Sequence, residues 1–373
     1  MEAVRSHDSL FVGGEWVESS GGDVLEVVSP YTEQVIATVP NGTRDDMDRA
    51  VAAARRAFTA GPWPVMSLEE RLLLVRRLRD LIVEQSEQFA QIITAEMGCP
   101  ITQSRSIQAV VPVGILDGYL DVAQTYSFRS VRKSSNGNAL ILREPVGVVA
   151  GVIPWNVPLS LTIQKLAPAL ITGCTIVLKP APESPLDAYL TAQLVERAGF
   201  PPGVVNLVAA DREVSEYLVT HPGVSKVTFT GSTFAGRRIA EACGNDLRRV
   251  TLELGGKSAA IILDDADLDQ AVEAMRLGSF RNNGQICSLK TRILVPAGIR
   301  DDLLDRMRDM VASMSVGDPR DEATHIGPLV SHRQRERVES YIRAGIADGG
   351  RLVVGGSRPD MPHGWFVEPS VFA

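Results

Sequence analysis

Four short apolar runs decide the fold: VGVVAGVI at residues 146–153, TIVL at 175–178, VVNLV at 204–208 and VSKVTFT at 224–230. Segments with helical periodicity separate them, over residues 159–171, 185–198 and 213–220. The alternation continues through a helix at 233–243 and strands at 250–254 and 259–263. Buried apolar strands that alternate with helices form parallel sheets covered on both faces. The sequence therefore predicts an α/β fold.

Outside this stretch the pattern indicates structural elements at both ends of the chain. Strand-like runs separated by turn residues cover residues 10–12, 16–18, 24–28 and 35–39, and helices are expected at 45–58 and 67–97. The second helix opens with the capping box Ser67-x-x-Glu70 and stops at Gly98. After residue 264 a second α/β unit is expected, with helices at 268–278, 300–314 and 331–347 and strands at 291–295 and 365–373.

A hairpin is predicted just before the first strand of the α/β stretch. Two β-prone runs, residues 126–132 and 139–143, flank SSNGN at 134–138, and Asn-Gly is the strongest short hairpin signal. Three basic residues, Arg129, Arg132 and Lys133, lie on one strand. They are compatible with a charged edge strand that resists aggregation, or with a projecting hairpin that contacts another subunit.

Composition excludes several classes of protein. Of the 373 residues, 45% are apolar and 22% are charged, which is typical of a chain with a sizeable core rather than a disordered one. With 38 Lys and Arg against 45 Asp and Glu, the net charge of −7 argues against a nucleic-acid partner. No secretory signal and no uncharged run of about 18 apolar residues is visible, so we expect no membrane partner. The four cysteines are too widely spaced for a disulfide framework or a zinc site, and reduced thiols in the cytoplasm fit best.

Two residues are candidates for catalysis, one as a nucleophile and one as a general base. Cys287 lies in the polar stretch NNGQIC between a predicted helix and a strand, whereas the other cysteines lie in apolar or helical surroundings. A thiol is intrinsically very nucleophilic, although no histidine stands nearby in the sequence to activate it. Glu253 interrupts the apolar strand LEL, and a carboxylate is costly to bury unless it is paired or protonated. It is a candidate general base, or alternatively a plain salt-bridged glutamate.

Three further positions fall where strands of such a sheet end. Asn156 follows the strand at 146–153 and can donate to an oxyanion, although a turn asparagine is the plainer interpretation. Lys179 ends the next strand, at the edge where these sheets bind ligands, or else is a solvated loop lysine. FTGSTFAG at 229–236 leads from a strand into a helix whose free N–H groups can face a pyrophosphate.

Taken together and in order, these motifs resemble the aldehyde dehydrogenase superfamily. They are PWN at 154–156, KP at 179–180, FTGST at 229–233, LELGGK at 252–257 and GQIC at 284–287, and the resemblance runs from about residue 9 to the end of the chain. It implies a Rossmann-like doubly wound cofactor domain and a second α/β catalytic domain.

The resemblance also implies a role for each motif. Cys287 would attack an aldehyde to give a thiohemiacetal and then a thioester, Asn156 would hold the oxyanion, and Glu253 would activate the water that releases the carboxylic acid. The cofactor would be NAD, with NADP possible, because Pro182 stands where many NAD-preferring members have a glutamate. The implied cofactor-binding residues are Ile153, Pro154, Trp155, Lys179, Pro182, Gly231, Ser232, Gly236 and Leu254.

For the chain as a whole, the resemblance implies residues 1–125 and 144–254 as the NAD(P)-binding domain. Residues 126–143 would be an oligomerisation hairpin and residues 255–373 the catalytic domain. The E-x-F-G-P segment and the terminal strand of the family do not appear, so a chain truncated at the C-terminus is expected. The full-length form would be a homodimer or homotetramer. The alternative function is a catalytically silent chain that binds nucleotide or other subunits.

Overall fold

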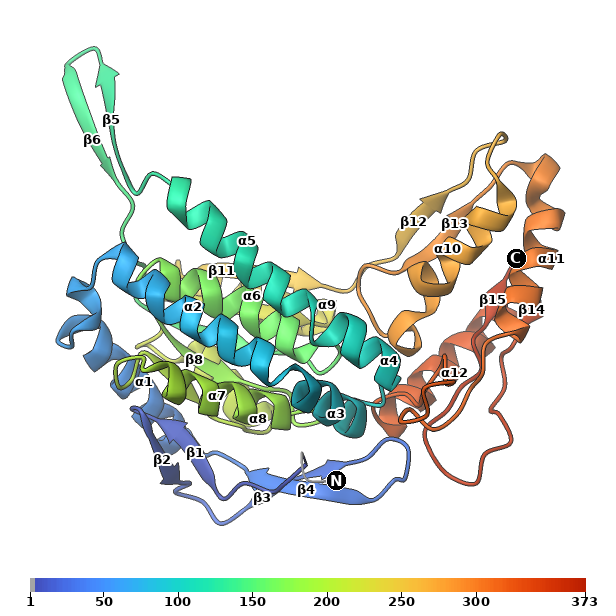
Figure 1. Cartoon of the computed structure of the whole chain (residues 1–373), viewed down its shortest axis with the longest axis horizontal. Coiled ribbons are helices and arrows are strands. Elements are labelled where there is room, and N and C mark those ends of the chain that lie inside the picture. The colour runs from blue at the N-terminus through green and yellow to red at the C-terminus, as the bar shows by residue number, and fades with distance from the viewer. Residues whose placement is uncertain (1–3) are drawn as a thin grey trace.

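A seven-stranded sheet organises the computed structural model, which describes residues 4–373 (Figure 1). The strand order is β11-β10-β7-β8-β9-β1-β2, and the five strands from β11 to β9 run parallel. Their bounds are β7 Val148–Val152, β8 Thr175–Lys179, β9 Val205–Leu207, β10 Lys226–Gly231 and β11 Arg249–Leu254. The predicted parallel sheet is therefore confirmed. Strands β1 (Ser9–Val12) and β2 (Glu15–Glu18) extend it antiparallel at one edge.

Side chains alternate between the two faces of the sheet and build a core on each. Val148, Ala150 and Val152 of β7 lie in one apolar cluster with residues of α1 and α8, while Val149 lies in the other cluster with residues of α6 and α7. The helices on the first face are α1 (Arg44–Thr59), α8 (Arg212–Thr220) and α9 (Thr233–Asn245). On the second face lie α6 (Pro158–Ile171) and α7 (Leu186–Ala198). Outside them lie α2 (Leu68–Glu84) and α3 (Ser86–Met97). Both faces are covered, as the sequence predicts.

A second lobe carries the C-terminal third of the chain, on the right of Figure 1. It contains β12 (Ser258–Ile261), α10 (Leu268–Phe280), β13 (Lys290–Leu294), α11 (Arg300–Ala312), α12 (His332–Ala347), β14 (Leu352–Val354) and β15 (Val371–Phe372). Its core includes Leu303 and Met307 of α11. The strand expected over residues 365–373 is shorter than predicted, because only its end forms a strand, β15. It pairs with β14, which the sequence pattern did not indicate. β3 (Val24–Val28) and β4 (Val35–Pro40) form a separate ribbon.

The helix expected over residues 67–97 is wrong in one respect. The chain forms two helices, α2 (Leu68–Glu84) and α3 (Ser86–Met97), because Gln85 leaves helical geometry at φ −98° and ψ 14°. Ile82 and Phe89, seven residues apart across the break, are both fully buried. The apolar period thus continues through the break and hides it from pattern analysis. The Ser67–Glu70 capping box and the left-handed Gly98 at the end are confirmed.

The sequence analysis missed the helical stretch Ile101–Thr125. It consists of α4 (Ile101–Gln103), a π-helical turn over Ser104–Gln108 and α5 (Val111–Thr125). By length and composition alone this stretch could cross a membrane, contrary to the expectation that no segment qualifies. It packs along α6 and α2, with Leu116 and Leu120 buried. These contacts bury part of its apolar surface, whereas Val110, Val111 and Val122 are exposed.

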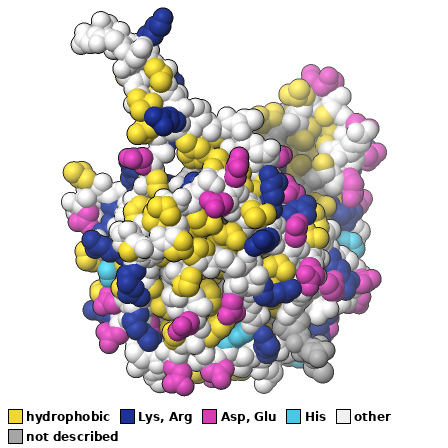
Figure 2. Space-filling model, turned by 60° about the vertical axis from the view of Figure 1, so that its left-hand side comes forward, with side chains coloured by type: hydrophobic (Ala, Val, Ile, Leu, Met, Phe, Trp, Pro, Cys, Tyr) yellow, Lys and Arg dark blue, Asp and Glu magenta, His cyan; other side chains and the backbone are white. Residues whose placement is uncertain are grey.

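The predicted hairpin is confirmed as β5 (Arg129–Ser134) and β6 (Gly137–Leu142). Ser134 pairs with Gly137, so the turn residues are Ser135 and Asn136 rather than Asn136 and Gly137. The hairpin stands clear of the body beyond α5, and Figure 2 shows hydrophobic side chains along it and at its base. It thus has no core of its own.

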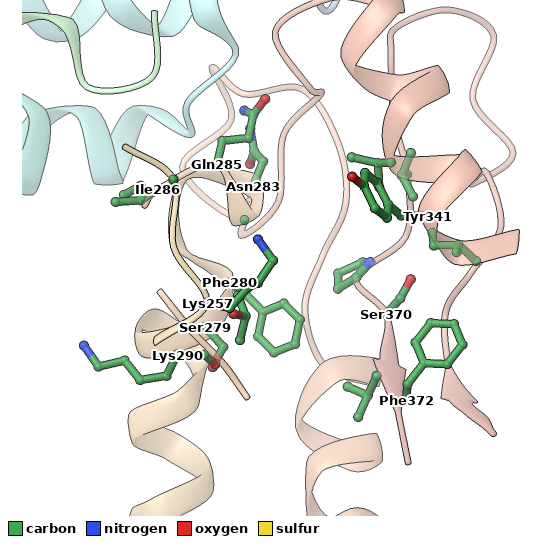
Figure 3. A pocket seen from close by; sticks show the side chains of 18 of the residues that line it. Lys257, Ser279, Phe280, Asn283, Gln285, Ile286, Lys290, Tyr341, Ser370 and Phe372 are labelled. Carbon is green, nitrogen blue, oxygen red and sulfur yellow. The ribbon is translucent and has the colours of Figure 1, made fainter. Parts of the chain in front are cut away.

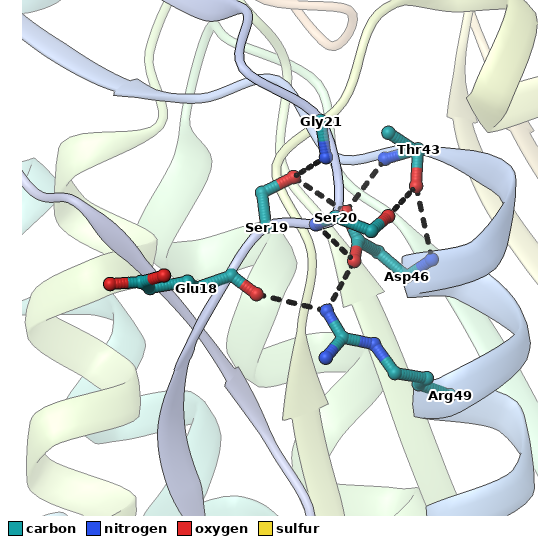
Figure 4. A network of polar contacts seen from close by, with 7 residues as sticks. All are labelled: Glu18, Ser19, Ser20, Gly21, Thr43, Asp46 and Arg49. Atoms are coloured by element: carbon teal, nitrogen blue, oxygen red, sulfur yellow. Dashed lines mark hydrogen bonds and ion pairs between the residues drawn. The ribbon is translucent and has the colours of Figure 1, made fainter.

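A buried carboxylate fastens the start of α1 to the turn after β2 (Figure 4). Asp46 accepts hydrogen bonds from Ser19 Oγ at 2.6 Å, Ser20 N at 3.0 Å and Thr43 N at 2.9 Å, and Arg49 also donates to it. Burial alone would raise the pKa of Asp46, but these hydrogen bonds outweigh it and hold the pKa well below its usual range. Asp46 therefore stays ionised within the fold.

The Asp46→Asn variant should lower the melting temperature at pH 7, because the amide replaces a charge-assisted acceptor at a cost of roughly 1–3 kcal/mol. A depressed folded-state pKa stabilises the fold above the unfolded-state pKa of about 4, and that contribution is lost as the pH falls through the folded value. The gap in melting temperature between wild type and variant should therefore narrow in acid. Thermal melts at pH 7 and pH 3 measure it, with the exposed neighbour variant Asp45→Asn as control. A gap of equal size at both pH values would contradict this assignment.

Candidate active site

A cleft of about 1170 Å³ opens where β7, β10 and β11 end and continues into the second lobe. The residues after these three strands line it together with the cysteine segment: Pro154, Trp155, Asn156, Gly231, Ser232, Leu254, Gln285, Ile286 and Cys287. Figure 3 shows Phe280 and Lys257 on one side and Tyr341 and Phe372 on the other. The carboxyl ends of parallel strands are where such sheets bind ligands. The structure therefore brings most of the predicted site residues to one cleft.

Asn156 is tied directly to the segment that bears the cysteine. Its side-chain Nδ2 donates to the carbonyl oxygen of Gln285 at 2.7 Å, two residues before Cys287. Gly256 also approaches this segment: a Cβ built on it would lie 3.5 Å from the Cys287 carbonyl oxygen. The PWN, LELGGK and GQIC motifs, far apart in sequence, are thus neighbours in space.

The cysteine segment follows an unusual backbone path. Asn282 and Asn283 both adopt left-handed conformations, with φ 54° and 57°, a region that asparagine tolerates better than most residues. The Asn283 carboxamide donates to the carbonyl oxygens of Gly98 at 2.9 Å and Pro328 at 2.8 Å and accepts from Gly327 N at 2.6 Å. These contacts hold the kinked backbone in place. The sequence analysis singled out this polar stretch but did not predict the hydrogen bonds that its side chains make to the backbone.

The expectation for Glu253 is wrong in one respect. The carboxylate is exposed rather than buried, because β11 is the edge strand of the sheet and is covered on one flank only. Glu253 pairs in register with Thr230, which lines the cleft. The free-energy cost of burying an unpaired carboxylate does not arise here.

Beside Glu253 lies a buried lysine that sequence reasoning missed. Lys165 of α6 is 5% exposed, and its Nζ donates to Thr230 Oγ1 at 2.6 Å. Burial lowers the pKa of Lys165 to about 8, and the Glu253 carboxylate partly offsets this effect. An apolar helix that carries a lysine on its buried face was the signal available in the sequence.

Three of the predicted cofactor residues form a group beside the cleft rather than in its lining. Ile153 N donates to the Lys179 carbonyl oxygen at 2.9 Å, and half-buried Pro182 follows three residues later. Lys179 is 5% exposed. Burial lowers the pKa of its ammonium to about 8, while Glu183 and Asp211 partly offset this.

The turn from β10 into α9 is built for a close approach. Ser232 caps α9 by accepting from Ala235 N at 3.2 Å, and the first N–H groups of a helix otherwise lack partners. A Cβ on Gly236 would lie 2.6 Å from Leu254 Cδ2, so any larger residue here would require the Leu254 side chain to move. Gly231 and Ser232 line the cleft, whereas Gly236 supports them from behind.

The chain is similar throughout its length to proteins of one family. A model of the aldehyde dehydrogenase family matches residues 16–373. Geranial dehydrogenase of Castellaniella defragrans is 44% identical over 98% of this chain and 77% of that protein. The structure of Mycobacterium tuberculosis aldehyde dehydrogenase complexed with NAD+ matches with a TM-score of 0.97 and 41% identity, covering 99% of this chain and 77% of that one. Aldehyde dehydrogenase C of Pseudomonas syringae, a mutant in complex with NAD+ and octanal, matches with a TM-score of 0.94 and 40% identity, covering 98% and 75%.

The four cysteines differ sharply in accessibility, which predicts their reactivity. Cys287 is exposed, whereas Cys99, Cys174 and Cys243 are buried. Burial raises the pKa of Cys99 to about 12 and also raises that of Cys243. Titration of the native protein with Ellman's reagent should therefore show one fast thiol, and denaturation should expose all four. Cys287→Ser should remove the fast phase, while Cys243→Ser, the matched control, should keep it. A fast phase that survives Cys287→Ser would contradict the exposure assigned to this thiol.

Proposed function

We propose that this chain, which belongs to the aldehyde dehydrogenase family, oxidises an aldehyde to a carboxylic acid through a covalent thioester on Cys287. The enzyme is an NAD-dependent aldehyde dehydrogenase, as its relatives are. The observation that carries the proposed mechanism is the 2.7 Å hydrogen bond from Asn156 Nδ2 to Gln285 O. It brings an oxyanion donor to the segment that bears the exposed thiol.

The residues at the carboxyl ends of the parallel strands fit the dinucleotide. Gly231 and Ser232 offer a turn and a helix N-terminus towards the cleft, where backbone N–H groups and the helix dipole favour a pyrophosphate. Trp155 lines the same cleft, and the buried ammonium of Lys179 lies at the end of the neighbouring strand. We assign cofactor binding to these residues and to Ile153, Pro154, Pro182, Gly236 and Leu254. When bound, NAD accepts the hydride from the aldehyde carbon.

The protein's own groups perform the acyl chemistry. The Cys287 thiolate adds to the aldehyde carbonyl carbon to give a thiohemiacetal. The developing oxyanion accepts hydrogen bonds from Asn156 Nδ2 and from the Cys287 backbone N–H. Such preorganised donors typically lower the barrier by roughly 3–4 kcal/mol. Loss of hydride from the thiohemiacetal leaves a thioester on the sulfur.

Glu253 is the proposed base for hydrolysis. It takes a proton from a water molecule that attacks the thioester carbonyl, so that the acid leaves and the thiol is restored. Its exposure on the edge strand gives it access to water. The Lys165 ammonium, which donates to Thr230, lies close to this carboxylate.

The parts of the chain divide these tasks. We assign residues 1–125 and 144–254 to cofactor binding, residues 255–373 to the catalytic part and residues 126–143 to subunit contact. The hairpin supports the last assignment because its strands are almost wholly exposed and carry apolar side chains: Val131, Leu140 and Leu142 are 65%, 47% and 52% exposed. An isolated two-stranded hairpin is marginally stable in water at best. We therefore propose a homodimer or homotetramer in the cytoplasm.

Rapid mixing of the protein with NAD and an aldehyde tests the mechanism. Octanal and geranial are suitable probes, and wild type should give a burst of NADH followed by steady turnover. Cys287→Ser should abolish both phases because no thioester forms. Glu253→Gln should keep the burst but slow turnover by roughly 100-fold or more, since the water loses its general base.

The matched control is Glu241→Gln, an exposed glutamate of α9 outside the cleft lining, which should leave both phases unchanged. NAD binding in calorimetry without a burst for any aldehyde would overturn the proposed reaction. It would favour a catalytically silent nucleotide-binding chain. A Glu253→Gln variant with unaltered turnover would remove Glu253 from the mechanism.

A single charge on the hairpin tests the assembly. Leu140→Arg should shift the protein towards a monomer in light scattering coupled to size exclusion, because a charge cannot be buried in an apolar contact without a partner. Leu73→Arg on α2 is the matched control, since Leu73 is also about half exposed, at 51%. If Leu140→Arg leaves the mass unchanged, or wild type is itself monomeric, the hairpin does not mediate assembly.

A further inference from the structure

A buried glutamine outside the recognised motifs contacts the proposed oxyanion donor. Gln108 ends the π-helical turn Ser104–Gln108 and is 2% exposed. Its Nε2 donates to the backbone carbonyl oxygen of Asn156 at 3.1 Å. The side chain of Asn282 donates to the same carbonyl oxygen at 2.9 Å. The carboxamides of Gln108 and Asn282 thus both donate to the same backbone oxygen of Asn156.

These contacts fix Asn156 at both ends. Gln108 and Asn282 hold its backbone, and its side chain is held through one N–H of Nδ2, which donates to Gln285 O at 2.7 Å. A carboxamide nitrogen carries two hydrogens. The second N–H of Nδ2 is therefore available in a fixed direction, which is the requirement for a preorganised oxyanion donor.

The local backbone supports a specific role for Gln108. The π-helical turn, closed by the hydrogen bond from Ala109 N to Ser104 O at 3.0 Å, places Gln108 on the buried face while Arg105 and Ser106 stay exposed. Such turns occur often at functional sites. Gln108 Oε1 has no hydrogen-bond partner among the described residues, so the side chain is buried with only its donor end used. A leucine or methionine would serve packing alone without that unpaired oxygen.

We propose that Gln108 is a positioning residue that, together with Asn282, orients Asn156 for oxyanion stabilisation. This inference rests on the proposed role of Asn156. Gln108 Nε2 contacts the Asn156 carbonyl oxygen and, at 3.5 Å, Asn282 Oδ1, so it acts on Asn156 directly and through the other residue that holds it. Its loss therefore weakens reactions that pass through an oxyanion and spares other reactions of Cys287.

Two reagents separate these classes of reaction without any cofactor. Acylation of Cys287 by 4-nitrophenyl acetate passes through a tetrahedral oxyanion and releases 4-nitrophenolate. Alkylation by iodoacetamide displaces iodide and forms no oxyanion. In Gln108→Met, which keeps the length of the side chain but removes its donor, the acylation rate should fall roughly 10- to 100-fold while the alkylation rate stays unchanged. Gln91→Met on α3, an exposed glutamine whose side chain donates to Glu87, is the matched control for both rates.

Asn282→Gly provides a second variant. It removes the other donor to the Asn156 carbonyl without adding a charge, and glycine adopts the left-handed backbone freely. It should show the same selective loss, and it decides the question if Gln108→Met fails to fold by circular dichroism. Equal losses in both rates, or no loss in either, would overturn the inference, as would a wild type that the ester does not acylate. Wild type that is acylated but gives no NADH with aldehydes would overturn the proposed dehydrogenase reaction and leave the role of Gln108 intact.

Discussion

The hydrogen bond from Asn156 Nδ2 to Gln285 O joins two parts of the chain that fold around different cores. Asn156 follows β7, whose residues are buried in the cores on the two faces of the sheet, and Gln285 belongs to the lobe with its own apolar cluster. The cleft lies between these parts. Because a rigid strand end sets the position of Asn156, the bond transfers that position to the segment that bears Cys287.

Neutral carboxamides rather than ion pairs hold the site together. Asn156, Asn282, Asn283 and Gln285 all bond backbone groups, and Gln285 Oε1 accepts from Val330 N at 3.1 Å. Ion pairs in the described residues lie mostly between exposed side chains elsewhere, where each contributes little to stability. These carboxamides themselves add no charge beside the thiol. Charged side chains also line the cleft, among them Lys257 and Lys290.

The sequence predicted elements whose signals are local and missed those that depend on neighbours. The strands from β7 to β11 and the residues at their ends follow from apolar runs and their order, so Asn156 and Lys179 could be singled out. Cys287 could be singled out from its polar surroundings. The break at Gln85 could not, because burial at Ile82 and Phe89 keeps the helical period. Gln108 and Lys165 also escaped, since each is an ordinary residue of an apolar helix whose importance depends on a contact 48 or 65 residues away.

The exposure of Glu253 shows how a wrong local expectation still fits the chemistry. An apolar strand predicts burial, but burial depends on whether a strand has neighbours on both sides, and β11 has one. A fully buried carboxylate would need a partner or a proton and would exclude water. At the sheet edge the carboxylate meets water freely, while Thr230 beside it holds the ammonium of Lys165 beneath. A base that must deprotonate water needs this access, and the edge position of β11 supplies it.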